Sequence, residues 1–441
     1  MSLSFKQAIE RLNKYTNYEK ETPKGTQGFG IDPVKALLAH LKGPCHRTPM
    51  IHIAGTKGKG STSWYAGALL HATGIKVGVF SSPHLVSVCE RISVNGVPIS
   101  EGKFAILAER VLQAAEEVRK ESRLKATWFD LMTVMAMLHF EEQEVIVVVL
   151  ETGLGGRLDS TNFCQPTVSV ITKIGFDHIN VLGETLSAIA MEKGGIIKKN
   201  IPFVTVQQDE VVMKVFRKLA EINDSSMRVV GENIHVNFEG QGVDIDTGTE
   251  YFTSLVKKTK GHFQWENIAL AVAAVEIVAK KIGLKFGEQD VRFVLSTLEI
   301  PGRMQSLGDM FLDCAHNPLS MRVLAQTLLD LEYSDVRLII GMARDKLIDE
   351  SLKVIAAFPA HVWCVPIPSE RSKDPEKLAA KIEALCPSAE VSVCKNFKEA
   401  LKQARQIKDS IDPIVVTGSV YLVGEALKEN VLKEISNESK M

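Results

Sequence analysis

The stretch IHIAGTKGKGST, at residues 51–62, decides the fold of this chain, because an aliphatic run leads directly into a glycine-rich loop. The glycines of this loop are Gly55, Gly58 and Gly60. Glycine lets successive backbone N–H groups point inward without interference from a Cβ atom. Lys59 adds a positive charge, and Ser61 or Thr62 offers a hydroxyl to Mg²⁺. A helical pattern follows, so the stretch predicts a phosphate-binding loop, although Gly60 after the lysine departs from the standard pattern.

Composition bounds the class of protein. A chain of 441 residues is long enough for two or three domains. The formal net charge is −1, from 52 basic and 53 acidic residues, so no overall field favours nucleic acid or an anionic membrane. The longest aliphatic run, at 145–150, is too short to cross a bilayer, and the N-terminus lacks a signal-peptide core. We therefore expect a cytoplasmic monomer with no nucleic-acid or membrane partner.

The cysteine pattern points to the same compartment. Seven cysteines are scattered without a CxxC pair, and their number is odd. This pattern argues against both a disulfide framework and a structural zinc site, and it favours a reducing cytoplasm.

Short aliphatic runs alternate with helical patterns over most of the chain, which predicts α/β architecture. The buried parallel strands expected first lie at 50–54, 76–80, 145–150 and 167–172. The alternation at 229–252 predicts antiparallel strands at the domain edge, and a helix is expected at 265–281. After a Pro-Gly break near residue 300, further strands are expected at 310–312, 337–340, 362–365, 391–393 and 414–416. We predict a doubly wound P-loop ATPase-type domain at 1–299 and a smaller Rossmann-like domain at 300–441.

Polar residues follow several of the expected strands. Glu151 ends an aliphatic strand, where a carboxylate needs a cation or a donor nearby, either Mg²⁺ or the partner of a structural salt bridge. Asp159 follows a glycine-rich stretch and either caps the next helix or binds substrate. His178 lies at the same sheet edge as Lys59 and Glu151. By composition alone, Lys193, on a helix expected at 185–199, is a solvated charge.

Two more groups of residues lie in loops. SSPHL and ERISVNG, at 81–85 and 90–96, indicate a loop with turn chemistry. In the second domain, Asp313 and His316 follow a strand in DCAHNP, and TGSVY follows another strand at 417–421. Both strand-end loops suit a small polar ligand, the alternative being that Asp313 caps a helix and His316 packs.

Taken together, these segments resemble the folylpolyglutamate synthases and bifunctional dihydrofolate synthases of the Mur ligase superfamily. The motifs occur in the family's order and span almost the whole chain. They are GTKGKGST, SSPHL with ERISVNG, ETGLGGRLDSTN, IGFDHINVLGETLSAIAMEKGGIIK, PGRMQ, DCAHNP and VTGSVYLVG. Two departures are Cys314 in place of a usual glycine and Gly194 in place of a usual alanine.

The resemblance implies a set of nucleotide and metal contacts. The ATP phosphates would be held by Gly58, Lys59, Gly60, Ser61 and Thr62. Ser82, Glu151 and His178 are similar to the family's Mg²⁺ ligands, with one metal by the phosphates and another toward the carboxylate substrate. Lys193 matches a lysine that the family carries as a carbamate. Asn267 and Arg303 would reach the nucleotide across the domain cleft, and Asp313 would contact its ribose or base side.

The remaining implied positions concern the other substrates. His316 with Ser419 would help to receive glutamate, and Thr127 and Phe129 would line the pterin-substrate pocket. Asp159 would be a further substrate-binding residue. Asp130, in the same segment, differs in length from the acidic residue that the family has there.

The resemblance thus implies an ATP-dependent amide ligase that adds L-glutamate to a pteroate or folate carboxylate through an acyl phosphate. Asp313 or His316 would handle the amine proton. Arg157 favours the bifunctional enzyme, whereas Lys57 and Ser160 favour a folylpolyglutamate synthase that does not use dihydropteroate. Two further classes are a cell-wall Mur-type ligase and a P-loop ATPase switch, but the second-domain motifs leave the switch unsupported.

Overall fold

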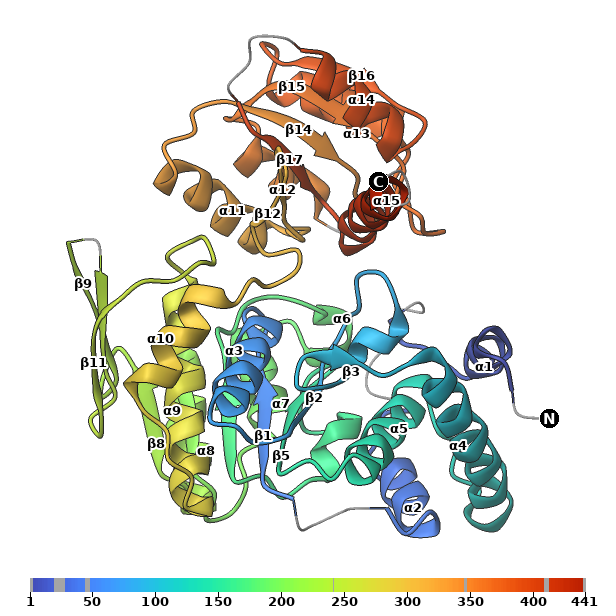
Figure 1. The fold of residues 1–441 in the computed structure, drawn as a ribbon, viewed down its shortest axis with the longest axis vertical. Helices are drawn as coiled ribbons and strands as arrows, with labels where there is room; N and C mark the ends of the chain where they lie inside the picture. The colour runs from blue at the N-terminus through green and yellow to red at the C-terminus, as the bar shows by residue number, and fades with distance from the viewer. Residues whose placement is uncertain are drawn as a thin grey trace. The chain divides into compact units, whose positions relative to one another are not determined.

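The computed structural model describes residues 3–19, 28–43, 48–240, 242–344, 347–407 and 412–438. The chain separates into two compact units, shown in Figure 1. The first contains Met1–His84, Cys89–Val256 and Trp265–Leu298, and the second contains Leu85–Val88, Lys257–Gln264 and Glu299–Met441. Two short segments from the first part of the chain therefore belong to the second unit.

The first unit is built on an eight-stranded sheet of order β4-β3-β2-β5-β1-β6-β7-β8. Its strands are β1 (Met50–Ala54), β2 (Val77–Phe80), β3 (Ile92–Val94), β4 (Val97–Pro98), β5 (Val147–Glu151), β6 (Val168–Ile171), β7 (Phe203–Val206) and β8 (Met227–Val230). All neighbouring pairs from β2 to β8 are parallel. Because β1 lies between β5 and β6, the order reverses around it, which confirms the doubly wound fold.

Helices cover this sheet along the strands that the site uses. Helix α3 (Lys59–Ala72) packs against β1, β2 and β5. Helices α7 (Leu186–Gly194) and α8 (Glu210–Asn223) bury Ile189 and Phe216 in one core with β6 and β7. The other helices are α1 (Phe5–Leu12), α2 (Asp32–His40), α4 (Glu101–Ser122), α5 (Trp128–Glu142), α6 (Ile179–Leu182), α9 (Gln264–Ile282), α10 (Glu288–Thr297) and the 3₁₀ turns η1 (Val88–Arg91) and η2 (Ser160–Phe163).

Three local expectations for this unit need correction. The helix expected at 185–199 ends at Gly194, because Gly194 and Gly195 lower its helix propensity. A side chain at position 195 would also overlap Arg157, so this position requires glycine. The segment at 92–98 is a β3–β4 hairpin added to the sheet edge, and not only a loop. Strand β8 pairs in parallel with β7, so the antiparallel sheet begins later, as β9 (His235–Glu239), β10 (Gly242–Asp246) and β11 (Tyr251–Leu255).

The second unit has a six-stranded sheet of order β12-β13-β17-β14-β15-β16, in which only β12 is antiparallel to its neighbour. Its strands are β12 (Gln305–Leu307), β13 (Met310–Leu312), β14 (Val336–Ile340), β15 (Pro359–Cys364), β16 (Glu390–Val393) and β17 (Ile414–Thr417). Its helices are α11 (Pro318–Asp330), α12 (Ile348–Ile355), α13 (Pro375–Leu385), α14 (Phe397–Gln406) and α15 (Val420–Glu438). Two separate hydrophobic cores, one with α11–α13 and one with α14 and α15, give the expected Rossmann-like layers.

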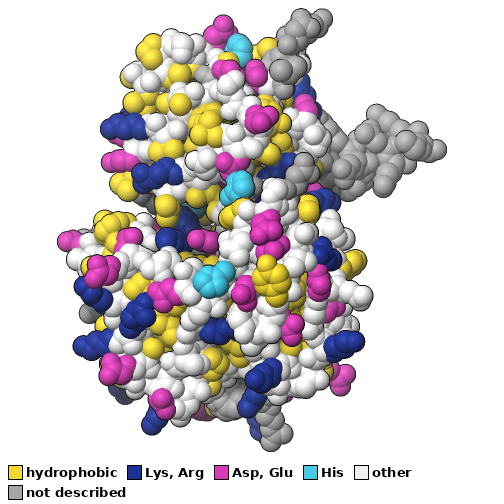
Figure 2. All heavy atoms as spheres, turned by 90° about the vertical axis from the view of Figure 1, so that its left-hand side faces the viewer, with side chains coloured by type: hydrophobic (Ala, Val, Ile, Leu, Met, Phe, Trp, Pro, Cys, Tyr) yellow, Lys and Arg dark blue, Asp and Glu magenta, His cyan; other side chains and the backbone are white. Residues whose placement is uncertain are grey.

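The surface agrees with the balanced composition. Figure 2 shows basic and acidic side chains interspersed on the face that it presents. Among the described helices, none is long and apolar enough to cross a membrane. The six cysteines that the structure describes are free thiols, and Cys45 lies outside the described residues.

Candidate functional site

The phosphate loop has the geometry that its glycines predict. Strand β1 ends at Ala54, and α3 begins at Lys59 with Gly58 as its N-cap, at φ 94°. This left-handed conformation favours glycine, and a Cβ at Gly58 would also overlap Oδ1 of Asn267. The first N–H groups of a helix have no partner within it, so this end of α3 presents donors and a positive dipole to an anion.

Polar side chains in the first turn of α3 are turned inward. Ser61 is 3% exposed and Thr62 is fully buried. The Thr62 hydroxyl has no hydrogen-bond partner in the structure, which is unusual for a buried polar atom. Nζ of Lys59 donates to the carbonyl oxygen of Gly55 at 3.1 Å. Asn267 lies on α9 in the same unit as this loop, so the expectation that it reaches across a domain cleft was wrong.

Glu151 faces this loop from the carboxyl end of β5. Its side chain is 2% exposed, and Oε2 accepts a hydrogen bond from the backbone N–H of Ser82 at 3.2 Å. A Cβ built on Gly60 would lie 3.7 Å from Oε2 and 3.8 Å from Oε1. Mg²⁺ prefers oxygen ligands, and both the Glu151 carboxylate and the Thr62 hydroxyl, which has no hydrogen-bond partner, can supply them. These residues therefore fit a magnesium site.

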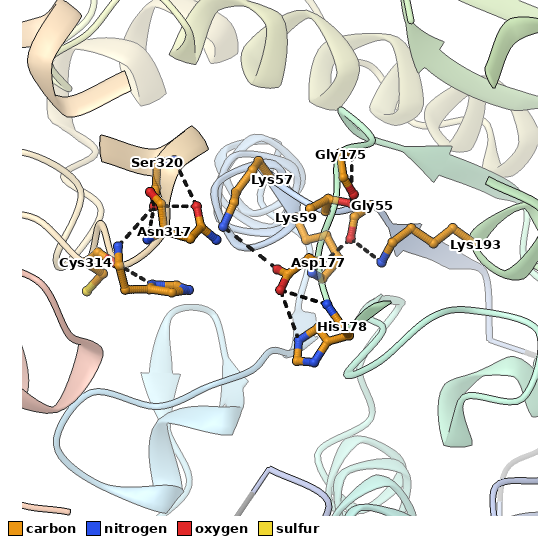
Figure 3. Close-up of polar contacts among 12 residues, drawn as sticks. Gly55, Lys57, Lys59, Gly175, Asp177, His178, Lys193, Cys314, Asn317 and Ser320 are labelled. Atoms are coloured by element: carbon orange, nitrogen blue, oxygen red, sulfur yellow. Dashed lines mark hydrogen bonds and ion pairs between the residues drawn. The ribbon is translucent and has the colours of Figure 1, made fainter. Parts of the chain in front are cut away.

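A second group of charged residues joins Lys57, in the phosphate loop, to Asp177 and His178, in the segment after β6 (Figure 3). Nζ of Lys57 lies 4.0 Å from Oδ2 of Asp177, and Nε2 of His178 lies 3.8 Å from Oδ1 of the same carboxylate. The His178 side chain is 51% exposed. The described residues contain no group of three His, Cys, Asp or Glu side chains arranged to hold a metal. The assignment of His178 as a ligand therefore stays a prediction, and Asp177 is a neighbour that the sequence did not single out.

Lys193 is a buried lysine, only 3% exposed. Its Nζ donates to the carbonyl oxygen of Gly55 at 2.8 Å, the same oxygen that Lys59 contacts (Figure 3). Burial, and after it the charge of Lys59, lowers the pKa of Lys193 to about 7. The burial of Lys193 makes the alternative of a solvated lysine on an amphipathic helix wrong, and this burial favours the neutral form of the amine.

Asp159 anchors the glycine-rich loop that follows β5. It is 4% exposed and is the N-cap of η2, so the capping alternative describes its local role. Oδ1 accepts from N–H of Thr161 at 3.0 Å, and Oδ2 accepts from N–H of Leu154 at 2.8 Å. Burial raises the pKa of Asp159, and these hydrogen bonds oppose the rise. The loop meets a predicted pocket residue, since a Cβ on Gly153 would lie 2.6 Å from the ring of Phe129.

Thr127 and Asp130 form a capping box at the start of α5. The Thr127 hydroxyl donates to Oδ2 of Asp130 at 2.7 Å and accepts from the Asp130 N–H at 3.2 Å. Asp130 is buried, its pKa is raised by that burial, and its Oδ1 accepts from the Ser160 hydroxyl at 2.6 Å. Thr127 thus acts structurally through its hydroxyl, and Asp130 ties the predicted pocket to η2.

In the second unit, Asp313 and His316 hold the loop after β13. Asp313 accepts from N–H of Met304 and of Ala315, each at 2.9 Å, while Asn317 is the N-cap of α11. Asp313 is therefore not the helix cap. Nδ1 of His316 lies 2.8 Å from the Cys314 carbonyl oxygen, which can only accept. Nδ1 must therefore carry the hydrogen, and Nε2 is the basic nitrogen of the neutral ring.

Two other predicted residues also lie in the second unit. Ser419 is buried before α15, and its Oγ accepts from N–H of Tyr421 at 3.1 Å. Arg303 lines a cavity of about 210 Å³ together with Lys258 and Lys260. Arg303 also donates to the Gly302 carbonyl oxygen at 3.3 Å.

Comparison with known proteins places this arrangement in a family. Residues 53–275 match the Mur ligase middle domain, and residues 302–420 match the Mur ligase glutamate ligase domain. The chain is 30% identical over 418 residues to the dihydrofolate synthase/folylpolyglutamate synthase of Bacillus subtilis, covering 92% of this chain and 96% of that protein. The chain belongs to the folylpolyglutamate/dihydrofolate synthase family. This is a family of ATP-dependent carbon–nitrogen ligases within the Mur ligase superfamily.

Other members of this family agree with that assignment. The dihydrofolate synthase/folylpolyglutamate synthase of Mycobacterium tuberculosis is 32% identical over 440 residues, covering 90% of each chain. The crystal structure of Mycobacterium tuberculosis folylpolyglutamate synthase complexed with ADP and AMPPCP superposes with a TM-score of 0.85 at 28% identity, covering 97% of this chain and 98% of that chain. The likeness to folylpolyglutamate synthases therefore extends over both compact units.

Proposed function

We propose that this chain joins the amine of L-glutamate to the carboxylate of a pteroate or folate, with conversion of ATP to ADP and phosphate. Two observations carry the proposal together: the buried Glu151 carboxylate faces the glycine loop at Gly60, and two residues further along α3 the buried hydroxyl of Thr62 has no hydrogen-bond partner. The nucleotide complex of the Mycobacterium tuberculosis relative supports ATP as the nucleotide.

The reaction needs activation of a carboxylate. A free carboxylate acylates poorly at neutral pH, because its negative charge repels nucleophiles and an oxide is a poor leaving group. Transfer of the ATP γ-phosphoryl group to one carboxylate oxygen gives an acyl phosphate, whose leaving group is phosphate. The N–H groups at Gly58, Gly60 and Ser61 would bind the ATP phosphates. Lys59 and Arg303 would stabilise the charge that develops during the transfer.

Glu151 and Ser82, with the Thr62 hydroxyl, would hold Mg²⁺ next to the phosphates. His178 is the third proposed ligand, for one metal by the phosphates or another toward the carboxylate substrate. When bound, Mg²⁺ supplies positive charge that offsets the charge of the phosphate oxygens. The protein's contribution is to orient the Glu151 carboxylate, through the Ser82 N–H that donates to it.

His316 is a better acceptor for the amine proton of glutamate than Asp313. Both oxygens of Asp313 accept backbone N–H groups, which favours a structural role. The Cys314 carbonyl oxygen fixes hydrogen on Nδ1 of His316 and leaves Nε2 as the base. We therefore assign the proton to His316, with Ser419 as a contact for glutamate. The two loops are joined next to these residues, where the N–H of Gly418 donates to the carbonyl oxygen of Ala315 at 2.9 Å. An active His316→Gln variant with an unchanged pH profile would contradict this assignment.

Lys193 is proposed to be carbamylated. The neutral amine attacks CO₂, a C–N bond forms, and one proton is released, which leaves an anionic carbamate. Burial of Lys193 favours the neutral amine that this step requires. Incubation with ¹³C-bicarbonate should give a carbamate NMR signal in the purified protein and none in Lys193→Arg. The absence of that signal from active wild-type protein would reject the modification.

For substrate scope, we propose that both dihydropteroate and folates are accepted. The bifunctional names of the Bacillus subtilis and Mycobacterium tuberculosis relatives support this choice. The alternative is an enzyme that extends folates only.

The deciding experiment mixes the purified chain with ATP, Mg²⁺, L-glutamate and either dihydropteroate or tetrahydrofolate. ADP release should require both glutamate and a pterin substrate, and mass spectrometry should show one added glutamate on each. Product from tetrahydrofolate alone would leave only the folate-extending enzyme. ATP hydrolysis that needs neither substrate would reject the ligase, and activity on a cell-wall precursor instead would assign the chain to that branch of the superfamily.

A further inference from the structure

A chain of buried polar side chains runs beneath the glycine-rich loop of residues 153–156. It links β1 to η2 through Cys164, His52, Thr161 and Asp159. His52 is fully buried on the central strand β1, among the aliphatic residues of MIHIA. Burying an imidazole there is unfavourable unless both ring nitrogens have partners. The hydrogen-bond partners of His52 therefore indicate its role.

Both ring nitrogens of His52 are engaged. Nε2 lies 2.8 Å from Oγ1 of Thr161, and Nδ1 lies 3.5 Å from Sγ of Cys164. Oγ1 of Thr161 lies 2.6 Å from Oδ1 of Asp159. Both oxygens of Asp159 already accept backbone N–H groups, from Thr161 and from Leu154, so Oδ1 acts as an acceptor and the single hydroxyl hydrogen of Thr161 points to it. Thr161 must then accept from His52, which places the ring hydrogen on Nε2 and leaves Nδ1 to accept the Cys164 thiol hydrogen.

The hydrogen bonds of this series all run toward Asp159. Every donor points the same way, from Cys164 to His52 to Thr161 to Asp159, and hydrogen bonds in series reinforce one another. Oδ2 of Asp159 in turn holds the N–H of Leu154. Leu154 belongs to the loop whose Gly153 lies against the ring of Phe129. The loop is therefore connected, through Asp159, to the hydroxyl of Thr161 and the imidazole of His52.

We propose that His52 and Thr161 are positioning residues that fix the loop at 153–156 as the wall of the pterin pocket, a role that rests on the proposed function. His52 acts as the neutral Nε2–H tautomer. It donates to Thr161 and so leaves the Thr161 hydrogen for Asp159. The same histidine sits on the strand that leads into the phosphate loop, so β1 supports both the nucleotide side and the pterin side of the site.

Thr161 offers a matched pair of substitutions. Thr161→Val keeps the shape and removes the hydroxyl, whereas Thr161→Ser keeps the hydroxyl. In wild type and both variants, KM for the pterin substrate and for ATP is measured separately. Thr161→Val should raise KM for the pterin substrate about tenfold or more, the size expected for loss of a buried hydrogen bond to a carboxylate, and should leave KM for ATP within about twofold. Thr161→Ser should restore the wild-type value.

His52 supplies a second pair, which decides the matter if Thr161→Val does not fold. The amide of Gln can place its N–H near the position of Nε2, whereas the shorter Asn places it near Nδ1. His52→Gln should therefore keep KM for the pterin substrate near wild type, and His52→Asn should raise it. Equal behaviour of the two variants, or parallel changes in KM for ATP and for the pterin substrate, would overturn the proposal.

Hydrogen exchange separates this inference from the proposed function. The N–H of Leu154 is held by Asp159, so amides at 153–156 should exchange faster in Thr161→Val than in wild type or Thr161→Ser. This measurement uses the whole protein without substrate. Faster exchange in Thr161→Val, found together with a wild-type protein that makes no folate product, would reject only the proposed function. Unchanged exchange in Thr161→Val, together with an unchanged KM for the pterin substrate, would reject the positioning role.

Discussion

Gly58 allows a sharp test of the phosphate loop. Gly58→Ala places a Cβ in a left-handed conformation, at φ 94°, and overlaps Oδ1 of Asn267. The left-handed conformation costs a non-glycine residue about 1–2 kcal/mol. Moving the Asn267 amide out of its rotamer adds about 0.5–1.5 kcal/mol. We expect about 2 kcal/mol of strain or more at the loop itself.

The strain at position 58 should appear as lost nucleotide affinity. If the loop relieves the strain by shifting, the conformation that binds phosphate becomes less populated, and about 2 kcal/mol corresponds to roughly 30-fold weaker binding. Binding of a fluorescent ATP analogue, measured with Mg²⁺, reports this loss directly. Turnover should fall with it.

Gly74 provides the matched control. It follows α3, has φ 88°, and a Cβ there would meet nothing within 4 Å. Gly74→Ala therefore carries the backbone penalty without the overlap. Both variants should lose some thermal stability, but only Gly58→Ala should lose nucleotide affinity. Equal affinities for the two variants would refute the argument that the Gly58–Asn267 contact shapes the loop.

Three further predictions concern charge. Lys59→Ala should abolish ligation. The circular dichroism spectrum and the melting temperature should stay near wild type, because Lys59 lies at the end of the loop and not in the core. Normal turnover of this variant would reject the role of Lys59 in phosphate binding. Glu151→Gln should raise the Mg²⁺ concentration needed for half-maximal activity, since one negative charge is lost with little change in shape; an identical titration would make Glu151 structural. The pKa of His52 is lowered to about 3 by burial, so below pH 6.5 the unfolded chain binds a proton that the native state does not, and stability falls as pH decreases toward 3. Urea unfolding should therefore show wild type losing about 2 kcal/mol more than His52→Gln between pH 7 and pH 5, and equal losses would contradict a neutral buried His52.

The features that were predicted well from the sequence are those determined by one continuous segment of the chain. The order of strand, glycine loop and helix at 51–62 fixed β1, the phosphate loop and α3, because strand burial and positive φ both depend on local residues. The turn at 92–98 was also predicted from local residues, because Asn95 and Gly96, with φ values of 53° and 78°, form it. The two strands on either side of the turn were missed, because they are short and lack a long aliphatic run.

The features that sequence left open depend on contacts between distant segments. Nothing near Lys193 in the chain shows that its amine reaches the Gly55 carbonyl oxygen, 138 positions away. The position of Asn267 against Gly58 likewise follows from α9 packing beside the loop. Asp159 could be a cap or a ligand by its spacing, and only the partners of its two oxygens show that it caps η2 and holds Leu154.

Unsatisfied buried atoms give an independent indication of where ligands bind. Among the described residues, the buried side-chain atoms without hydrogen-bond partners include Thr62 Oγ1, Thr152 Oγ1 and Asn162 Oδ1, and also Nδ1 of His139 on α5. The three oxygens lie in the first turn after the phosphate loop, directly after Glu151, and in η2. Folded proteins rarely leave such atoms unpaired, since each costs about 1–3 kcal/mol. Other polar groups in the same region, including Asp159, Thr161 and His52, are fully paired through a continuous chain. A site that pairs its supporting groups and leaves hydroxyl and amide oxygens unpaired is suited to a ligand that brings its own cations and donors, as Mg²⁺ with ATP does.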